Sequence, residues 1–257
     1  MKIYRSYCWA WLLAAACTPA GQEKNTLVHH RVFVLADPAA VKAPAAGSTV
    51  SADTSYLENV FKAYDLVDVR DLDSGICVKL SYAGTGNFLG ADFYDGLRRA
   101  YLPCEVAIRL CNAQHYLQSV NPGLSLLVLD ATRPLHLQQL MWDSLDLPPD
   151  RKFNYLSPPY ATSLHNYGCA VDLTILDLSQ NQALDMGTHF DEFIPLSQPV
   201  QEWRFLKSGA LSQEAFDNRR LLRFVMKKAG FASIPSEWWH FGYGSKETAA
   251  AKFKLIK

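Results

Sequence analysis

The alternation of apolar and polar positions indicates where strands lie along the chain. Residues 76–82 alternate apolar side chains with small or polar ones, which is typical of a half-buried strand. Residues 125–129 form an unbroken apolar run suited to a central strand. Residues 169–175 and 238–243 are two further candidates. The pattern therefore predicts strands at these four places.

Three segments have the spacing and the end residues of helices. In residues 103–120, a proline starts the helix and most apolar side chains fall on one side: Val106, Ile108, Leu110, Leu117 and Val120. A second helix starts near Pro134. Ser212 is a good N-cap for a third helix that runs to Ala229, and Gly230 follows its end.

Strands and helices without regular βαβ alternation favour an α+β fold. We expect a single domain over residues 56–257, with a small, mostly antiparallel central sheet flanked by helices. Residues 18–55 are rich in Pro, Gly, Ala, Ser and Thr and are expected to form a linker or lead-in, with a short strand at 31–35. The 257 residues suffice for one large domain with a hydrophobic core.

The first seventeen residues have the pattern of a secretory signal peptide. Lys2 and Arg5 precede a ten-residue apolar stretch, which is too short to span a bilayer but has the length of a signal h-region. We therefore expect residues 1–17 to direct export to the periplasm or cell envelope. The alanines before Cys17 leave open a lipid anchor on that residue or ordinary cleavage nearby, and the intact mass of membrane-extracted protein distinguishes the two.

Charge argues against one class of partner. The chain has 25 basic and 25 acidic side chains, so its overall charge gives no reason to expect nucleic acid. Any binding must therefore come from a local site.

Export would also permit disulfides between the cysteines. Cys104 and Cys111 are about 10 Å apart in the predicted helix, which is too far for them to pair with each other. Cys77 could pair with either of them, and free buried thiols are expected for the other cysteines.

Two segments carry the residue types of a metal site. The first is an S-x-H-x-x-G-x-x-x-D arrangement, with His165 in a loop and Asp172 in the following strand. Gly168 would let the chain turn back between them, because glycine tolerates positive φ. The second segment, E-x-x-H, ends at His240. Two imidazoles and one carboxylate form a good ligand set for zinc with one position left for water.

The positions of the charged residues constrain this hypothesis. Glu237 and His240 are three residues apart, so on an ideal strand they would face opposite ways, and a bulge or turn must bring both to one metal. Asp130 and Arg133 follow a buried strand, where charges are costly unless they are paired or used. From the residues alone, a structural ion pair and a functional role for these two are both open.

Together these motifs resemble the zinc D-alanyl-D-alanine dipeptidases of the vancomycin-resistance type, within the bacterial cell-wall D,D-peptidases. The resemblance runs from about residue 66 to residue 243. The motifs occur in one order: Ser81-Tyr82-Ala83 with Asn87-Phe88-Leu89-Gly90, Asp130-Ala131-Thr132-Arg133-Pro134, residues 163–172, residues 184–191, and Glu237-Trp238-Trp239-His240. Several motifs in this order are far more specific than a lone E-x-x-H.

The resemblance implies one Zn²⁺ per chain at the sheet, held by His165, Asp172 and His240. It implies Glu237 as general base and acid, and Arg133 as the group that stabilises the transition state. It also implies that four residues hold the dipeptide, the two acids meeting its free amino group: Asp130, Asp191, Ser163 and Tyr82. Cys169, a thiol inside the metal loop, would compete as a ligand if it faced the metal.

The reaction that follows from the resemblance is hydrolysis of D-alanyl-D-alanine by metal-activated water. The D-configuration and the alanine side chains rest on the resemblance alone. A peptidoglycan D,D- or L,D-carboxypeptidase or endopeptidase and a non-catalytic module that binds wall peptides are the alternatives. Glu237 and Arg133 favour an enzyme, because a binder needs neither a proton shuttle nor oxyanion charge. The expected partner is a small peptide, and a membrane only through a lipid anchor on Cys17.

Overall fold

The computed structural model of the chain describes residues 56–257. The predicted signal peptide at 1–17, with Cys17, and the lead-in at 18–55, with its expected strand, lie outside the described residues. Within the described part, no helix combines the length and the apolar character needed to cross a membrane.

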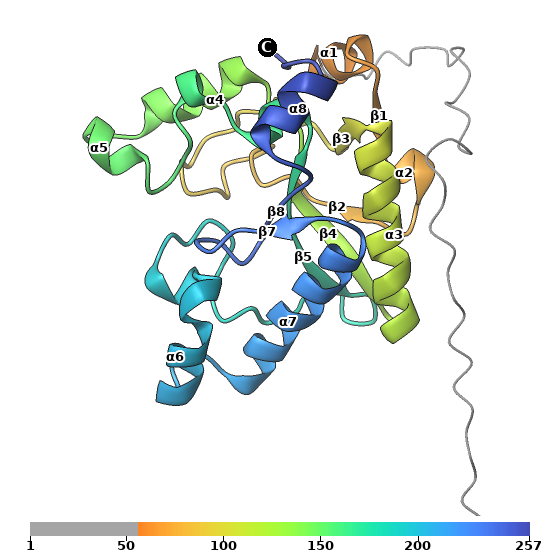
Figure 1. The fold of residues 1–257 in the computed structure, drawn as a ribbon, viewed down its shortest axis with the longest axis vertical. Coiled ribbons are helices and arrows are strands. Elements are labelled where there is room, and N and C mark those ends of the chain that lie inside the picture. The colour runs from red at the N-terminus through yellow and green to blue at the C-terminus, as the bar shows by residue number, and fades with distance from the viewer. Residues whose placement is uncertain (1–55) are drawn as a thin grey trace, which may run out of the picture. The chain divides into compact units, whose positions relative to one another are not determined.

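One sheet of six strands organises the domain (Figure 1). Its order is β2-β4-β5-β8-β7, and β6 pairs with β5 beside that path. The strands are β2 (Cys77–Val78), β4 (Leu124–Asp130), β5 (Ala170–Asp177), β6 (Gln182–Ala183), β7 (Ala232–Ser233) and β8 (His240–Gly242). Only the β2–β4 pair in this sheet is parallel. A separate antiparallel pair is formed by β1 (Leu66–Asp68) and β3 (Tyr101–Pro103). The α+β prediction with a mostly antiparallel sheet is therefore confirmed.

Helices flank this sheet. They are α1 (Tyr56–Ala63), α2 (Val69–Leu72), α3 (Cys104–Val120), α4 (Leu135–Ser144), α5 (Pro149–Lys152), α6 (Glu202–Ser208), α7 (Gln213–Lys228) and α8 (Lys246–Lys252). The two long helices, α3 and α7, lie side by side and contact β4 and β5 respectively (Figure 1). Because these helices cover one face of the sheet, a functional cleft on the sheet must use its other face or its end.

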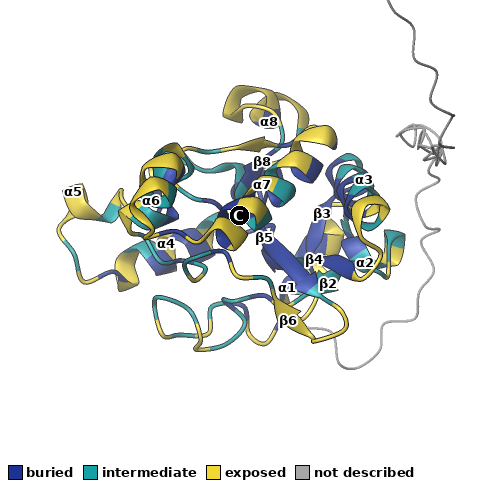
Figure 2. Ribbon diagram, turned by 90° about the horizontal axis from the view of Figure 1, so that it is seen from below, coloured by how far each residue is buried: buried dark blue, intermediate teal, exposed yellow. Residues whose placement is uncertain are grey.

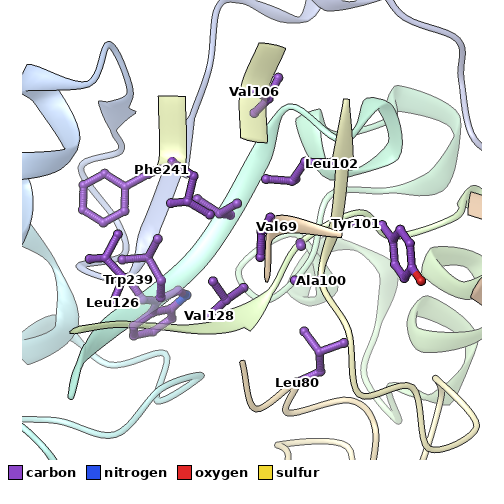
Figure 3. Packing of buried hydrophobic residues seen from close by; sticks show 14 of the residues in the cluster. Val69, Leu80, Ala100, Tyr101, Leu102, Val106, Leu126, Val128, Trp239 and Phe241 are labelled. Carbon is purple, nitrogen blue, oxygen red and sulfur yellow. The ribbon is translucent and has the colours of Figure 1, made fainter. Parts of the chain in front are cut away.

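The core lies between the sheet and these helices. Leu126 and Val128 of β4 are fully buried, as is Val106 of α3, and Phe241 of β8 packs in the same cluster (Figure 3). The central strands are buried while the outer sides of the helices are exposed (Figure 2). Burial of this apolar surface, at about 25 cal/mol per Å², stabilises the sheet on which the polar site is built.

Most predicted elements are found close to their predicted ends. Five elements start and end within about two residues of the predicted segments, where these had defined ends: α3, β4, α4, β5 and α7. The strand predicted at 76–82 is shorter, because only Cys77–Val78 is regular, although Lys79 and Ser81 still donate backbone hydrogen bonds to β4. Val120, predicted on the apolar side of α3, is exposed because it is the last residue of the helix.

The predicted helix caps are confirmed. The Ser212 hydroxyl accepts a hydrogen bond from the Ala215 N–H at 3.0 Å, which caps the start of α7. Gly230 follows the end of that helix with φ of +93°. Such caps satisfy backbone groups that a helix end leaves without partners.

The disulfide considered between Cys77 and Cys104 or Cys111 is not formed. All four cysteines of the described residues are free: Cys77, Cys104, Cys111 and Cys169. Burial raises the pKa of Cys111 to about 12, as expected for an unreactive core thiol.

Gly168 gives a stability prediction. It has φ of +66°, and a Cβ there would lie 2.5 Å from Pro103 Cδ and 2.8 Å from Thr132 Oγ1. Gly209 has φ of +76° but no atom within 4 Å of a Cβ, so it isolates the backbone cost. We expect Gly209→Ala to lower the free energy of unfolding by about 1 kcal/mol and Gly168→Ala by about 2–4 kcal/mol. Urea denaturation measures both, and equal losses would contradict the close packing at Gly168.

Candidate metal centre and substrate cleft

The sheet register aligns three polar residues at one end. On β5, Asp172 is paired with Asp130 of β4 on one side and with His240 of β8 on the other. Paired residues point to the same face of a sheet. A register shift between Val128 and Asp130 lets Asp130 join this row. The three side chains therefore stand together although they come from distant parts of the chain.

His165 enters from the loop before β5. It lies in the 3₁₀ turn η3 (Leu164–Tyr167), which begins with a capping box between Ser163 and Asn166 and ends at Gly168. Gly168 adopts the left-handed conformation that the sequence analysis assigned to it. The Arg133 N–H donates to the His165 carbonyl at 3.0 Å, so the two loops that carry the site are joined through their backbones.

His165, Asp172 and His240 bring one donor atom each into a single cluster. His165 Nε2 and His240 Nδ1 are 3.2 Å apart, Asp172 Oδ1 is 2.9 Å from His240 Nδ1, and it is 3.5 Å from His165 Nε2. Tetrahedral Zn²⁺ with ligands at about 2.0–2.1 Å separates its donor atoms by about 3.3 Å. His165 Nδ1 lies 2.7 Å from the Ala131 carbonyl, a contact that leaves Nε2 as the ligand atom. The three residues thus fit one divalent ion.

The electrostatics of the cluster agree with this fit. Burial opposes ionisation of Asp172, but His165 and His240 outweigh burial and hold the pKa of this carboxyl well below its usual range. Burial would lower the pKa of His240, yet the hydrogen bond and the charge of Asp172 raise it. Asp172 is therefore a carboxylate, the form that binds a metal.

Cys169 does not belong to the cluster. Its side chain is fully buried, and its sulfur lies 3.5 Å from the Tyr167 carbonyl oxygen. Burial raises the pKa of this thiol to about 12. The competition considered for Cys169 therefore does not arise in this structure.

Arg133 is held rigidly beside the cluster. Its guanidinium donates two hydrogen bonds to Asp130 Oδ2, one of them from Nε at 3.1 Å, and stacks 5.2 Å from the ring centroid of Tyr82. Burial would lower the pKa of Arg133, but the negative Asp130 keeps it well above the usual range. The arginine therefore stays charged in a buried position.

Asp130 is held by protein donors on both of its carboxylate oxygens. Its carboxylate is fully buried and is not among the groups that line the cleft. Arg133 binds Oδ2, while the Tyr94 hydroxyl donates to Oδ1 at 2.6 Å and the Ala131 N–H at 2.9 Å. Both of its oxygens therefore have protein donors, and the predicted contact of Asp130 with the peptide amine stays a prediction. No sequence pattern pointed to Tyr94.

Asp191 is the buried acid that does line the cleft. The Tyr82 hydroxyl donates to its Oδ2 at 2.8 Å, and its backbone φ is +60°, in the left-handed region. Burial, and then the charge of Asp172, raises the pKa of Asp191 well above its usual range. A positive group placed beside it would reverse this shift.

A buried arginine anchors the segment that carries Asp191. Arg219 of α7 is fully buried and donates to the carbonyls of Met186 at 2.6 Å and Leu196 at 3.0 Å. The indole N–H of Trp238 donates to Thr188 Oγ1 at 2.8 Å, which connects the same segment to the residues before β8. Asp191 is thus positioned by α7 and by the residues next to Glu237.

Glu237 reaches the cleft through the turn that the sequence analysis required. A bend at residues 235–239 precedes β8, which starts only at His240. Glu237 and His240 both line the cleft, which has a volume of about 630 Å³. The other lining residues include Tyr82, Arg133, Ser163 and Asp191. Burial is the main cause of the raised pKa of Glu237. Lys246 also lines the cleft, at the start of α8, where no motif drew attention to it.

Comparison with known proteins places this geometry in a family. A family model described as D-ala-D-ala dipeptidase matches residues 62–256. The D-alanyl-D-alanine dipeptidase of Escherichia coli (strain K12) is 32% identical over 177 residues, which cover 69% of this chain and 83% of that protein. The enzyme of the same name from Synechocystis sp. is 31% identical over 186 residues, with coverages of 62% and 74%.

The D-alanyl-D-alanine dipeptidase of Enterococcus faecalis is 30% identical over 182 residues and covers 65% of this chain and 85% of its own. Among solved structures, the LdcB LD-carboxypeptidase is a distant match, with a TM-score of 0.37 and 19% identity over 61% of this chain and 67% of that one. The family match over most of the described residues makes the chain a hydrolase that belongs to the D-Ala-D-Ala dipeptidase family of peptidases.

Proposed function

We propose that the chain hydrolyses the dipeptide D-alanyl-D-alanine with a zinc ion held by His165, Asp172 and His240. One observation carries the proposal: three metal-ligand atoms within 4.8 Å of one another share a cleft with Glu237 and Arg133. The donor set of two imidazoles and a carboxylate suits Zn²⁺, and the family of the chain supports peptidase chemistry. When bound, the zinc ion supplies an activated water and polarises the scissile carbonyl.

Glu237 would act as the proton carrier. Its carboxylate lines the same cleft as the ligand residues but is not one of the three clustered ligands. Burial raises its pKa, which makes the carboxyl a stronger base once it is ionised. We propose that it takes a proton from the attacking water and gives it to the leaving amine.

Arg133 would stabilise the negative charge that develops on the carbonyl oxygen. Its two hydrogen bonds to Asp130 fix the guanidinium before the substrate arrives, so little reorganisation accompanies the reaction. Loss of a fixed donor of this kind typically costs about 100- to 1,000-fold in rate. In this proposal Asp130 orients Arg133.

Asp191 would bind the free amino group of the peptide. Its carboxyl is buried in the cleft wall, next to the hydroxyl of Tyr82. An ammonium group is the partner that would stabilise its charged form. Ser163 lines the cleft from the start of the turn that carries His165, and its hydroxyl donates to Gln138 Oε1 at 2.9 Å. It is the remaining proposed contact to the peptide.

A carboxypeptidase or endopeptidase acting on peptidoglycan peptides is the second candidate. The cleft volume of about 630 Å³ is larger than two alanine residues need, and two exposed or half-buried aromatic residues, Phe153 and Tyr155, lie along it. This extra room favours the second candidate, whereas the buried acid Asp191 favours a short peptide with a free amine.

A substrate panel tests the proposed function. We expect the full chain to hydrolyse D-alanyl-D-alanine, to leave L-alanyl-L-alanine almost untouched, and to lose activity with a chelator and regain it with Zn²⁺. A muramyl pentapeptide serves as the competing substrate. Faster release of D-alanine from the pentapeptide than from the dipeptide would replace the proposal with the carboxypeptidase alternative.

The role of Glu237 is tested by separating turnover from metal binding. Glu237→Gln keeps the side-chain shape but cannot accept the proton, so kcat should fall by about 100- to 10,000-fold while the zinc content stays near one per chain. His240→Ala removes a ligand and should lower the zinc content itself. His136→Ala, an exposed histidine of α4, is the matched control and should change neither quantity. Loss of zinc in Glu237→Gln would remove the proton-carrier role.

Recognition of the amine by Asp191 has its own signature. Asp191→Asn removes the charge but keeps the hydrogen bond with Tyr82 possible, so KM for the free dipeptide should rise by about 10- to 100-fold. For an N-acylated dipeptide, which has no ammonium group, KM should change little. A similar rise for both substrates would show that Asp191 does not meet the amine.

A further inference from the structure

A second cavity lies on the same face of the sheet as the metal cleft. It has a volume of about 1170 Å³, and β4 and β5 contribute Leu127, Leu129 and Thr174 to it. Leu127 and Thr174 are paired in register, so both point to one face. Thr174 follows Asp172 by two positions on β5, which keeps it on that face about 7 Å further along the strand.

A thin wall separates this cavity from the metal cleft. Three segments form it, and in each segment neighbouring residues line opposite sides. Tyr82 and Asp191 line the cleft, whereas the residues on either side of them line the cavity. Likewise, Trp239 lines the cleft and Trp238 lines the cavity. The Tyr82–Asp191 hydrogen bond joins two of these segments. The cavity is therefore a distinct space next to the proposed substrate site.

Two polar atoms at the cavity have no partner within the described residues. Thr174 is 4% exposed, and its Oγ1 makes no hydrogen bond to any of residues 56–257. Arg70 Nε is also buried without a partner there, although the same side chain donates from Nη2 to the Arg98 carbonyl at 3.1 Å. A buried hydroxyl without a hydrogen-bond partner destabilises the fold. A ligand that reached Thr174 would satisfy it.

The charges around the cavity differ between its two sides. On the β2 side, Lys79 and Arg98 line it, and no acid of the described residues forms an ion pair with either. Lys79 follows Cys77, which pairs with Leu127, so its side chain points to the cavity face. On the β6 side, Asp185 lines the cavity, and no cation of residues 56–257 forms an ion pair with it.

The width of the sheet beneath the cavity matches the length of a short peptide. Three inter-strand steps lead from β2 through β4 and β5 to β6, which is about 14 Å. An extended chain of four residues spans about the same length. We propose that this cavity binds a zwitterionic peptide of about four small apolar residues, with its carboxylate at Lys79 and Arg98 and its ammonium at Asp185. The side chains would lie over Leu127 and Leu129, and a backbone group would meet Thr174.

Calorimetric titration with tetra-alanine tests this site without any turnover. The metal-loaded full chain with Glu237→Gln is first saturated with D-alanyl-D-alanine to fill the cleft, and tetra-alanine is then added. We expect one tetra-alanine per chain. The additional change Lys79→Glu should weaken binding by about fivefold, and Thr174→Val by about three- to tenfold. N-acetyl tetra-alanine amide, which lacks both charges, should bind at least about tenfold more weakly.

Two controls make the result specific. Lys207→Glu makes the same charge change on α6 and should leave binding unchanged. Thr174→Val removes an unpartnered hydroxyl, so its melting temperature should equal or exceed that of the parent protein, which separates lost binding from lost folding. Failure of tetra-alanine to bind, or equal binding in the parent, Lys79→Glu and Thr174→Val, overturns the proposal. Because no hydrolysis is measured, a failure of the proposed dipeptidase activity would leave this result readable.

Discussion

The burial of negative charge at one end of the sheet is the constraint on which this structure depends. Four carboxyl groups gather there, and a single guanidinium lies among them: Asp130, Asp172, Asp191, Glu237 and Arg133. Each buried carboxylate is costly unless it is paired. Arg133 is hydrogen-bonded to Asp130, and its charge also lowers the pKa of Asp191 and of Glu237. Burial, and then the charge of Asp172, raises the pKa of Asp191 and of Glu237, and a divalent ion and a peptide ammonium would favour their charged forms.

The surrounding fold makes this arrangement rigid. The sheet register fixes Asp172 and His240. His165 is fixed by its 3₁₀ turn, and its carbonyl accepts a hydrogen bond from the Arg133 N–H. Asp191 has no regular element of its own, and Arg219 of α7 holds its segment instead by donating to two backbone carbonyls. Rigidity of this kind keeps charged groups at the distances that metal and substrate require, so stability and function rest on the same contacts.

The sequence predicted the parts of the site that have a local physical signal. Apolar runs located β4 and β5, proline and serine marked the starts of α3 and α7, and the need for a reversal singled out Gly168. The turn between Glu237 and His240 followed from the alternation of strand side chains. The segment around Asp191 gave no such signal, because long-range bonds hold it. Asp191 was therefore found through family resemblance alone.

Asp130 illustrates the limit of a motif. A D-x-x-R arrangement at a strand end fits a substrate-binding acid as well as an ion pair, and only the surroundings distinguish the two. Tyr94, 36 positions earlier in the chain, donates to Asp130 Oδ1, a contact that no local pattern indicates. Asp191 lines the cleft and accepts a hydrogen bond from Tyr82, and the second cavity begins behind them. The proposed selection for a short peptide and the separation of the two cavities thus depend on the same hydrogen bond.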